Sequence, residues 1–161
     1  MSIDKDKYIK KIDVNEEKGE AAADSICKSG GFAEFIACDV SKKTQVEELV
    51  SRVVLEKKRL DVMIANAAIL HVADLFELEE DDFDRVLGVN LKGVFFCGQS
   101  AAKQMIKQQS GSIINMSSIQ AIITNPNILS YAVCKGAIKQ LTVSMALALA
   151  DKGVRVNAIG P

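Results

Sequence analysis

Apolar runs of strand length alternate along this chain with stretches in which apolar residues recur at helical spacing. Residues 60–65 (LDVMIA), 112–117 (SIINMS) and 154–159 (VRVNAI) are nearly continuous apolar runs, which are typical of strands covered on both faces by helices. Weaker patterns predict strands at 8–13 and 32–38. The spacing between strands predicts four helices, at about 15–29, from Ser41 onward, at 81–108 and at 128–150.

Capping and helix-breaking residues mark the ends of these helices. Asn15 and Ser41 stand where N-cap side chains are expected, and Gly30-Gly31 and Gly153 follow two of the predicted helices. Strands separated by helical stretches form βαβ units with parallel strands. The sequence therefore predicts an α/β fold, a doubly wound parallel sheet of the Rossmann type. Its length of 161 residues corresponds to one domain.

Composition and charge argue against several classes of protein. The 20 Lys and Arg residues balance 21 Asp and Glu, which gives no electrostatic case for binding nucleic acid or a membrane surface. The first eleven residues hold no apolar signal region, and no long apolar run follows, so we expect a cytoplasmic protein without a membrane span. The single histidine, His71, has no second ligand at metal-binding spacing, so we expect no metal site.

The segment Tyr131-Ala-Val-Cys-Lys135 is the first candidate for chemistry. A Tyr and a Lys four positions apart lie on one face of a helix, one turn apart. An ammonium beside a phenol favours the phenolate, which is the form that a Tyr general acid and base needs near neutral pH. An exposed amphipathic pair is the alternative interpretation, and this motif alone does not exclude it.

Three further polar features favour a functional site over an exposed amphipathic pair. Ser117-Ser118 ends one buried strand, and Asn66 ends another. Asn90 lies within an apolar helical stripe, where a polar residue is either satisfied locally or functional. Because ligands of open α/β sheets bind at the carboxyl ends of the strands, these side chains are expected along one edge of the sheet.

Several stretches in order now resemble the short-chain dehydrogenase/reductase family in its single-domain form. They are IDVNEEKGE (12–20), CDV (38–40), ANAA (65–68), VNLKGVF (89–95), INMSS (114–118), YAVCK (131–135) and VNAIGP (156–161). The spacing of 13 positions between Ser118 and Tyr131 also matches that family. Ala68, where the family usually has Gly, and Lys10 and Lys11, in a strand that is normally apolar, depart from its pattern.

The resemblance implies a catalytic set of four residues. Tyr131 would exchange a proton with the substrate oxygen, and Lys135 would favour the Tyr phenolate and hold the nicotinamide ribose. Ser118 would bond the carbonyl or hydroxyl oxygen of the substrate. Asn90 would order a relay of water and backbone behind Lys135. The implied reaction is hydride transfer between a secondary alcohol or carbonyl compound and a nicotinamide cofactor.

The resemblance also implies where the cofactor would bind. Asp13 matches the acid that holds the adenosine ribose, and a carboxylate there favours NAD over NADP. Asp39 and Val40 would lie at the adenine and Asn66 beneath the cofactor, while Tyr131 and Lys135 would hold its nicotinamide end. The residues expected around the substrate, among them Ile119, Gln120 and Ile128, are apolar or neutral and suggest an uncharged small molecule.

Both ends of the chain depart from the family pattern. No glycine precedes Asp13, so the glycine-rich turn that holds the pyrophosphate is not found upstream of it. The sequence also stops before the family's substrate-covering segment. We therefore expect an incomplete Rossmann-like domain over residues 1–161, with residues 1–8 outside the resemblance and without the first βα unit and the C-terminal segment.

The expected gap has consequences for the sheet and for function. Either the strands ending at Asp13 and Ala65 pair directly, or the sheet has a gap between them. This polypeptide is expected to bind NAD weakly. Two functions stay open: an oxidoreductase, or a catalytically impaired remnant that acts only through association of the helices at 81–108 and 128–150. In the family that the chain resembles these helices form the dimer interface, so the resemblance also implies a homo-oligomer.

Overall fold

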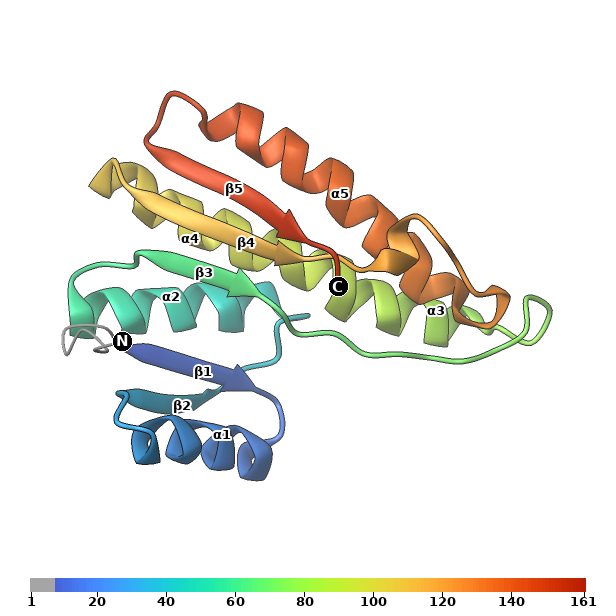
Figure 1. Ribbon diagram of the computed structural model, residues 1–161, viewed down its shortest axis with the longest axis horizontal. Helices are drawn as coiled ribbons and strands as arrows, with labels where there is room; N and C mark the ends of the chain where they lie inside the picture. The colour runs from blue at the N-terminus through green and yellow to red at the C-terminus, as the bar shows by residue number, and fades with distance from the viewer. Residues whose placement is uncertain (1–7) are drawn as a thin grey trace. The chain divides into compact units, whose positions relative to one another are not determined.

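The computed structural model describes residues 8–161, which form two compact units divided after Asp39 (Figure 1). Residues 1–7, most of the N-terminal stretch placed outside the resemblance, lie outside the described part of the chain. All five described strands are parallel to their neighbours and alternate with helices, as the hydrophobic pattern predicts. The fold is therefore of the α/β, Rossmann-like class.

The first unit consists of two strands and one helix. Its elements are β1 (Ile9–Asp13), α1 (Glu16–Lys28) and β2 (Ala33–Ala37). Asn15 caps α1 as expected, because its side chain accepts a hydrogen bond from the Lys18 amide at 2.9 Å. Lys10 lies directly opposite Glu34 in the register of β1 and β2, and its Nζ is 2.6 Å from Oε2 of Glu34. This ion pair explains how a lysine is accommodated in β1 with its side chain largely buried.

The second unit is a three-stranded parallel sheet with the order β3-β4-β5. Its strands are β3 (Val62–Ala65), β4 (Gly111–Met116) and β5 (Val154–Ile159). Its helical elements are α2 (Lys43–Lys57), α3 (Glu80–Leu87), η1 (Gly88–Gly93), α4 (Val94–Gln108), η2 (Ile119–Ala121), η3 (Pro126–Ile128) and α5 (Leu129–Leu149). The two strands of the first unit, β1 and β2, pair with each other in a sheet of their own. The two arrangements considered for β1 and β3 stay predictions, because these strands belong to different units.

An aliphatic core joins α4 and α5 to one face of this sheet. Its buried members come from four elements and are Ala101, Ala102, Met105, Ile113, Leu149, Val154 and Val156. The segment Pro126–Leu149 is long and apolar enough to cross a membrane, but a core helix of a globular fold satisfies the same criterion. Because α5 packs on β4 and β5, this segment is weak evidence for a membrane span.

The helical stretch predicted at 81–108 is confirmed, since α3, η1 and α4 follow one another without a break and η1 is a π-helical segment. Two local predictions are wrong. Helix α2 has Lys42 at its N-cap position, without a side-chain cap bond, so Ser41 is not the cap. In β3, Val62 and Ile64 are about half exposed, because this edge strand is not covered on both faces in the structure.

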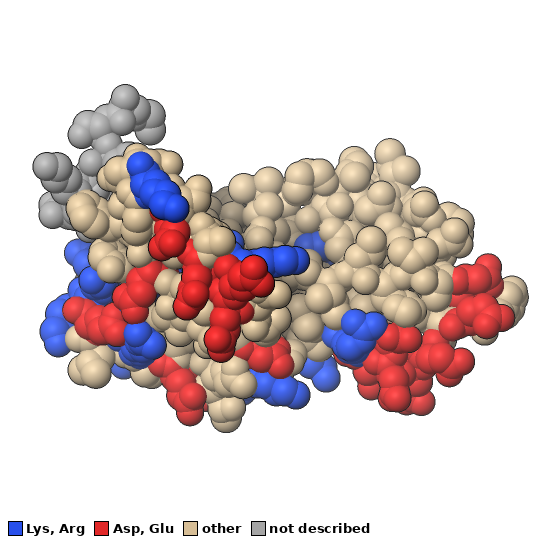
Figure 2. Space-filling model, turned by 90° about the horizontal axis from the view of Figure 1, so that it is seen from below, with Lys and Arg blue, Asp and Glu red and all other residues tan. Residues whose placement is uncertain are grey.

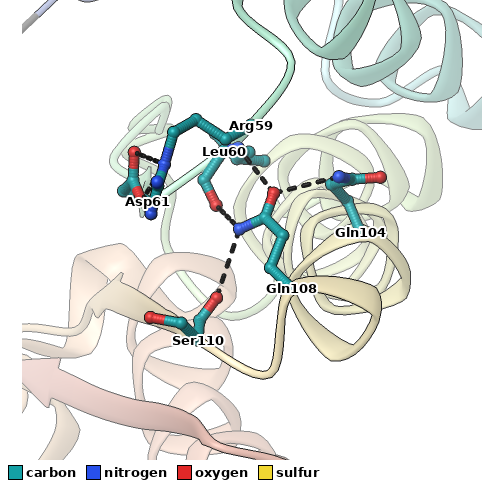
Figure 3. Close-up of polar contacts among 6 residues, drawn as sticks. All are labelled: Arg59, Leu60, Asp61, Gln104, Gln108 and Ser110. Carbon is teal, nitrogen blue, oxygen red and sulfur yellow. Dashed lines mark hydrogen bonds and ion pairs between the residues drawn. The ribbon is translucent and has the colours of Figure 1, made fainter.

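A glutamine at the end of α4 fastens the chain that enters β3 (Figure 3). The carboxamide of Gln108 accepts a hydrogen bond from the Leu60 amide and donates to the Leu60 carbonyl, both at 2.9 Å. It also donates to the Ser110 carbonyl at 3.3 Å and accepts from the side chain of Gln104 at 2.9 Å. A side-chain amide thus satisfies both main-chain groups of Leu60, two residues before β3 begins.

Candidate active site

Tyr131 and Lys135 lie one turn apart in the first half of α5, as their spacing predicts. The Lys135 side chain is buried, with 3% of the residue exposed, and its Nζ lies 5.3 Å from the centre of the Tyr131 ring. The ammonium donates a hydrogen bond to the Met116 carbonyl at the end of β4. Burial lowers the pKa of Lys135, and the neighbouring Cys134 opposes this only in part. The exposed amphipathic pair is therefore excluded for Lys135.

Cys134 stands beside Lys135 but carries no charge at neutral pH. Its thiol is fully buried, with Sγ 3.9 Å from the Val86 carbonyl. Burial raises the pKa of Cys134 to about 11, although the charge of Lys135 acts in the other direction. The ammonium of Lys135 is thus held mainly by the Met116 carbonyl and not by a thiolate.

The two serines that follow β4 have different surroundings. Ser118 is partly exposed; its Oγ donates to the Pro161 carbonyl at 3.3 Å and accepts from the Gln120 amide at 3.2 Å. Ser117 is buried and donates through Oγ to the main-chain carbonyl of Lys135 at 2.9 Å. Ser118 is therefore available at the edge of the sheet, whereas Ser117 faces α5.

Asn90 is completely buried in η1, and both polar atoms of its carboxamide form hydrogen bonds with the main chain of Ile69. Its Oδ1 accepts from the Ile69 amide and its Nδ2 donates to the Ile69 carbonyl, each at 2.8 Å. Ile69 lies three residues after Asn66, which is exposed just beyond the end of β3. Asn90 thus fastens the loop that carries Asn66, and the relay implied by the resemblance stays a prediction.

Of the residues expected at the adenosine end, Asp13 and Asp39 belong to the first unit and Val40 to the second. Asp13 ends β1, and its Oδ1 accepts a hydrogen bond from the Asn15 amide at 3.0 Å. Among the described residues Oδ2 has no hydrogen-bond partner, which suits an acceptor for ribose hydroxyls. Asp39 is half-buried, and the Val40 side chain is buried against Gly93, where a Cβ would meet Val40 Cγ2 at 2.8 Å.

Two apolar loops follow the carboxyl ends of β3 and β4. A hydrogen bond of 3.0 Å joins the Ala73 amide of the first loop to the Asn127 carbonyl of the second. Their large exposed side chains are Leu70, Val72, Leu75, Phe76, Ile119, Ile122 and Ile123. This concentration of exposed apolar side chains at the carboxyl ends of two strands offers a surface for an apolar ligand.

Acidic residues gather next to these loops (Figure 2). Within residues 74–84 the acidic side chains are Asp74, Glu77, Glu79, Glu80, Asp81, Asp82 and Asp84. Arg85 follows them and pairs with Asp82 at 2.5 Å, which lowers the pKa of that carboxyl group. The segment therefore keeps a strong negative charge beside the apolar surface.

Comparison with known proteins identifies the family. A sequence model described as short chain dehydrogenase matches residues 3–161. An uncharacterized oxidoreductase of Thermotoga maritima is 40% identical over 92% of this chain and 59% of its own length. A 3-oxoacyl-(acyl-carrier-protein) reductase FabG of Staphylococcus aureus is 37% identical over 91% of this chain and 60% of its own length. The chain therefore belongs to the short chain dehydrogenase family, whose members are NAD(P)-dependent oxidoreductases.

Solved structures agree with this assignment. The crystal structure of NAD+-bound xylitol dehydrogenase has a TM-score of 0.92 and 36% identity, covering 96% of this chain and 60% of that chain. A gluconate 5-dehydrogenase from Burkholderia cenocepacia in complex with NADP and tartrate has a TM-score of 0.88 and 34% identity, covering 94% and 60%. This chain spans about 60% of the length of the curated relatives it matches.

Proposed function

We propose that this protein is an oxidoreductase that interconverts an uncharged secondary alcohol and its carbonyl compound with a nicotinamide dinucleotide. The observation that carries the proposal is the buried Lys135 ammonium, 5.3 Å from the Tyr131 ring and next to the end of β4, which the partly exposed Ser118 follows. A buried cation costs free energy unless it is bound. Within residues 8–161 the Lys135 ammonium donates its hydrogen bond to the Met116 carbonyl, which directly precedes the two serines.

Each residue of the site has a separate role in the proposed reaction. When bound, the dinucleotide supplies or accepts the hydride. Tyr131 gives a proton to the substrate oxygen or takes one from it, and the Lys135 ammonium stabilises the phenolate that results. Ser118 donates a hydrogen bond to the same substrate oxygen, where negative charge develops. Asn90 holds the Ile69 peptide and with it the loop carrying Asn66.

NAD is the proposed cofactor, with NADP less favoured. The support is Asp13, whose carboxylate accepts hydrogen bonds from ribose hydroxyls and repels a 2′-phosphate. Similar solved structures include one with NAD+ and one with NADP, so family membership alone does not choose between them. Calorimetric titration with NADH and with NADPH tests the choice. Tighter NADH binding that Asp13→Asn weakens supports it, and tighter NADPH binding contradicts it.

The substrate is proposed to be apolar and uncharged. Val72, Ile122 and the other exposed side chains of the two loops would cover an aliphatic chain, and the acidic segment 74–84 would repel an anion. Two ketones of equal length separate these effects: 2-octanone is neutral, and 7-oxooctanoate carries a carboxylate at its far end. We expect the neutral ketone to be reduced faster, and faster turnover of the anionic ketone at low salt would contradict the proposal.

Association through helices is a second candidate function, and exposed apolar side chains on α4 and α5 favour it. Phe95 and Ile106 on α4, and Val143 and Leu147 on α5, are exposed, Leu147 by 75%. We propose that a second copy of the chain covers this surface. Sedimentation velocity of wild type and Leu147→Asp tests the proposal: it predicts a dimer that the charge dissociates. A monomeric wild type would contradict it.

The oxidoreductase proposal is tested by product formation at millimolar NADH, a concentration chosen because weak cofactor binding is expected. The product 2-octanol is measured by gas chromatography. We expect alcohol from the wild type and at least about a 100-fold loss in Ser118→Ala and Tyr131→Phe. Equal amounts of alcohol in wild type and Tyr131→Phe would overturn the proposed mechanism, and an oligomer without alcohol would favour the association function.

A further inference from the structure

Ser117 is the member of the serine pair that contacts the catalytic helix. The side chains of Ile113, Asn115 and Ser117 alternate along the face of β4 that meets the helices, with an apolar residue first and two polar residues after it. Asn115 is fully buried and donates through Nδ2 to Thr142 Oγ1 at 2.9 Å. Ser117 donates to the Lys135 carbonyl at 2.9 Å. Two polar contacts therefore connect β4 to α5, two turns of the helix apart.

Lys135 is consequently held at both of its ends by the same short segment of β4. Its ammonium donates to the carbonyl of Met116, and its own main-chain carbonyl accepts from the hydroxyl of Ser117, the next residue. Met116 and Ser117 also remain joined to the sheet, because the Ser117 amide donates to the Ile159 carbonyl at 2.7 Å. The position of Lys135 relative to Ser118 thus depends on one hydroxyl group that does not itself reach the edge of the sheet.

We propose that Ser117 is a positioning residue that fixes the Lys135 turn of α5 against the end of β4, so that Tyr131 and Ser118 keep their relative places. The proposed effect on catalysis rests on the oxidoreductase function. The contact between Ser117 and Lys135 is present whether or not that function is correct. The two adjacent serines then have separate functions: Ser118 acts on the substrate oxygen, and Ser117 acts through the backbone of Lys135.

Removal of the Ser117 hydroxyl has a limited structural cost. The Lys135 carbonyl lies inside α5 and keeps its place in the helical hydrogen-bond pattern, so Ser117→Ala leaves no main-chain group without a partner. Lys135 loses the tether that holds it at its buried place. The side chain then spends more time near solvent, and the loss of one hydrogen bond corresponds to about a five- to tenfold change in that equilibrium.

The test compares Ser117→Ala with Ser118→Ala, using Ser117→Thr as the variant that retains the hydroxyl. The titration of the Lys135 side chain is followed by NMR with ¹⁵N-labelled lysine, a measurement that does not depend on activity. Its titratable neighbours are Tyr131 and Cys134, both on α5. The residues that contact it at the end of β4, Met116 and the following Ser117, carry no titratable group. A matched measurement of kcat against pH is made where the wild type is active.

We expect Ser117→Ala to move the Lys135 titration upward, toward the ordinary value for lysine, and Ser117→Thr to restore it. Ser118→Ala should leave this titration unchanged while abolishing turnover. Identical Lys135 titration in wild type and Ser117→Ala would overturn the proposal, even if the enzyme is active. If no variant is active but the titration responds as expected, the positioning role stands and the oxidoreductase function fails. If Ser117→Ala does not fold, Ser117→Cys retains the volume with a weaker donor and serves in the same comparison.

Discussion

Replacing Asn90 with alanine is expected to release the loop that follows β3. The Asn90 side chain is completely buried, and its two hydrogen bonds of 2.8 Å both end on the Ile69 peptide. Alanine removes both partners at once and leaves the Ile69 amide and carbonyl without them. Ile69 is half-buried, so water can reach these groups only in part. The loop lies between β3 and Ala73, whose amide is bonded to Asn127.

The magnitude follows from the two bonds. A net hydrogen bond contributes about 1 kcal/mol, and a buried group left without a partner costs about 1 to 3 kcal/mol. Because Ile69 is half-buried, we take the lower part of the range of about 1 to 3 kcal/mol for its amide and for its carbonyl. We therefore expect Asn90→Ala to lower the free energy of unfolding of the second unit by about 2 to 3 kcal/mol, which is a factor of about 30 to 150 in the equilibrium constant.

Urea denaturation followed by circular dichroism measures this loss, and amide hydrogen exchange at Ile69 locates it. Asn157→Ala is the matched control, because Asn157 is exposed on β5 and has no hydrogen bond of its side chain among the described residues. We expect the control to change the free energy by less than about 0.5 kcal/mol. If Asn90→Ala also changes stability by less than this and the Ile69 amide exchanges as in wild type, the anchoring role of Asn90 is refuted.

Two further predictions concern buried charge and buried thiols. Glu34→Gln should destabilise the first unit more than Lys10→Met does, by about 1 to 2 kcal/mol in urea denaturation, because only the former removes the carboxylate charge at 2.6 Å while the largely buried Lys10 ammonium remains; equal losses would contradict this. At pH 8, iodoacetamide should alkylate the exposed Cys27 far faster than the buried Cys134, as measured by peptide mass spectrometry. Because the pKa of Cys134 is raised to about 11, only the unfolded chain loses this proton from about pH 9 upward, so the free energy of unfolding should fall between pH 9 and 11. That fall should be smaller in Cys134→Ala, and an equal fall in both proteins would contradict the assignment.

The sequence pattern predicts the order of strands and helices well, because β3, β4 and β5 are nearly continuous apolar runs and each helix has apolar residues at helical spacing. The pattern does not predict whether both faces of a strand are covered by other elements. The run LDVMIA has the same composition as a strand covered on both faces, although Val62 and Ile64 are about half exposed. Exposure depends on neighbours distant in sequence, which the local pattern does not contain.

The parts of the candidate site that depend on residue type and on the ends of strands could be predicted from the sequence. The Tyr131 and Lys135 spacing predicts a shared helix face, and Ser118 and Asn66 follow apolar runs, as the structure has them. The contacts of Asn90 with Ile69 and of Ser117 with Lys135 were not predictable, because the partner is a main-chain group in both cases. Every residue type carries the same main-chain amide and carbonyl, so the sequence does not show which residue provides the partner.

Hydride transfer from the nicotinamide to the carbonyl carbon is expected to depend on the proton that Tyr131 gives to the substrate oxygen. The most direct measurement incubates the chain with 2-octanone and NADH deuterated at C4 and determines deuterium at the alcohol carbon by mass spectrometry. Tyr8→Phe is the matched control, since Tyr8 is the other tyrosine of the sequence and lies just before β1. The account predicts deuterated 2-octanol from wild type and Tyr8→Phe, and at least about 100-fold less from Tyr131→Phe. Equal deuterium incorporation by Tyr131→Phe and wild type would contradict it.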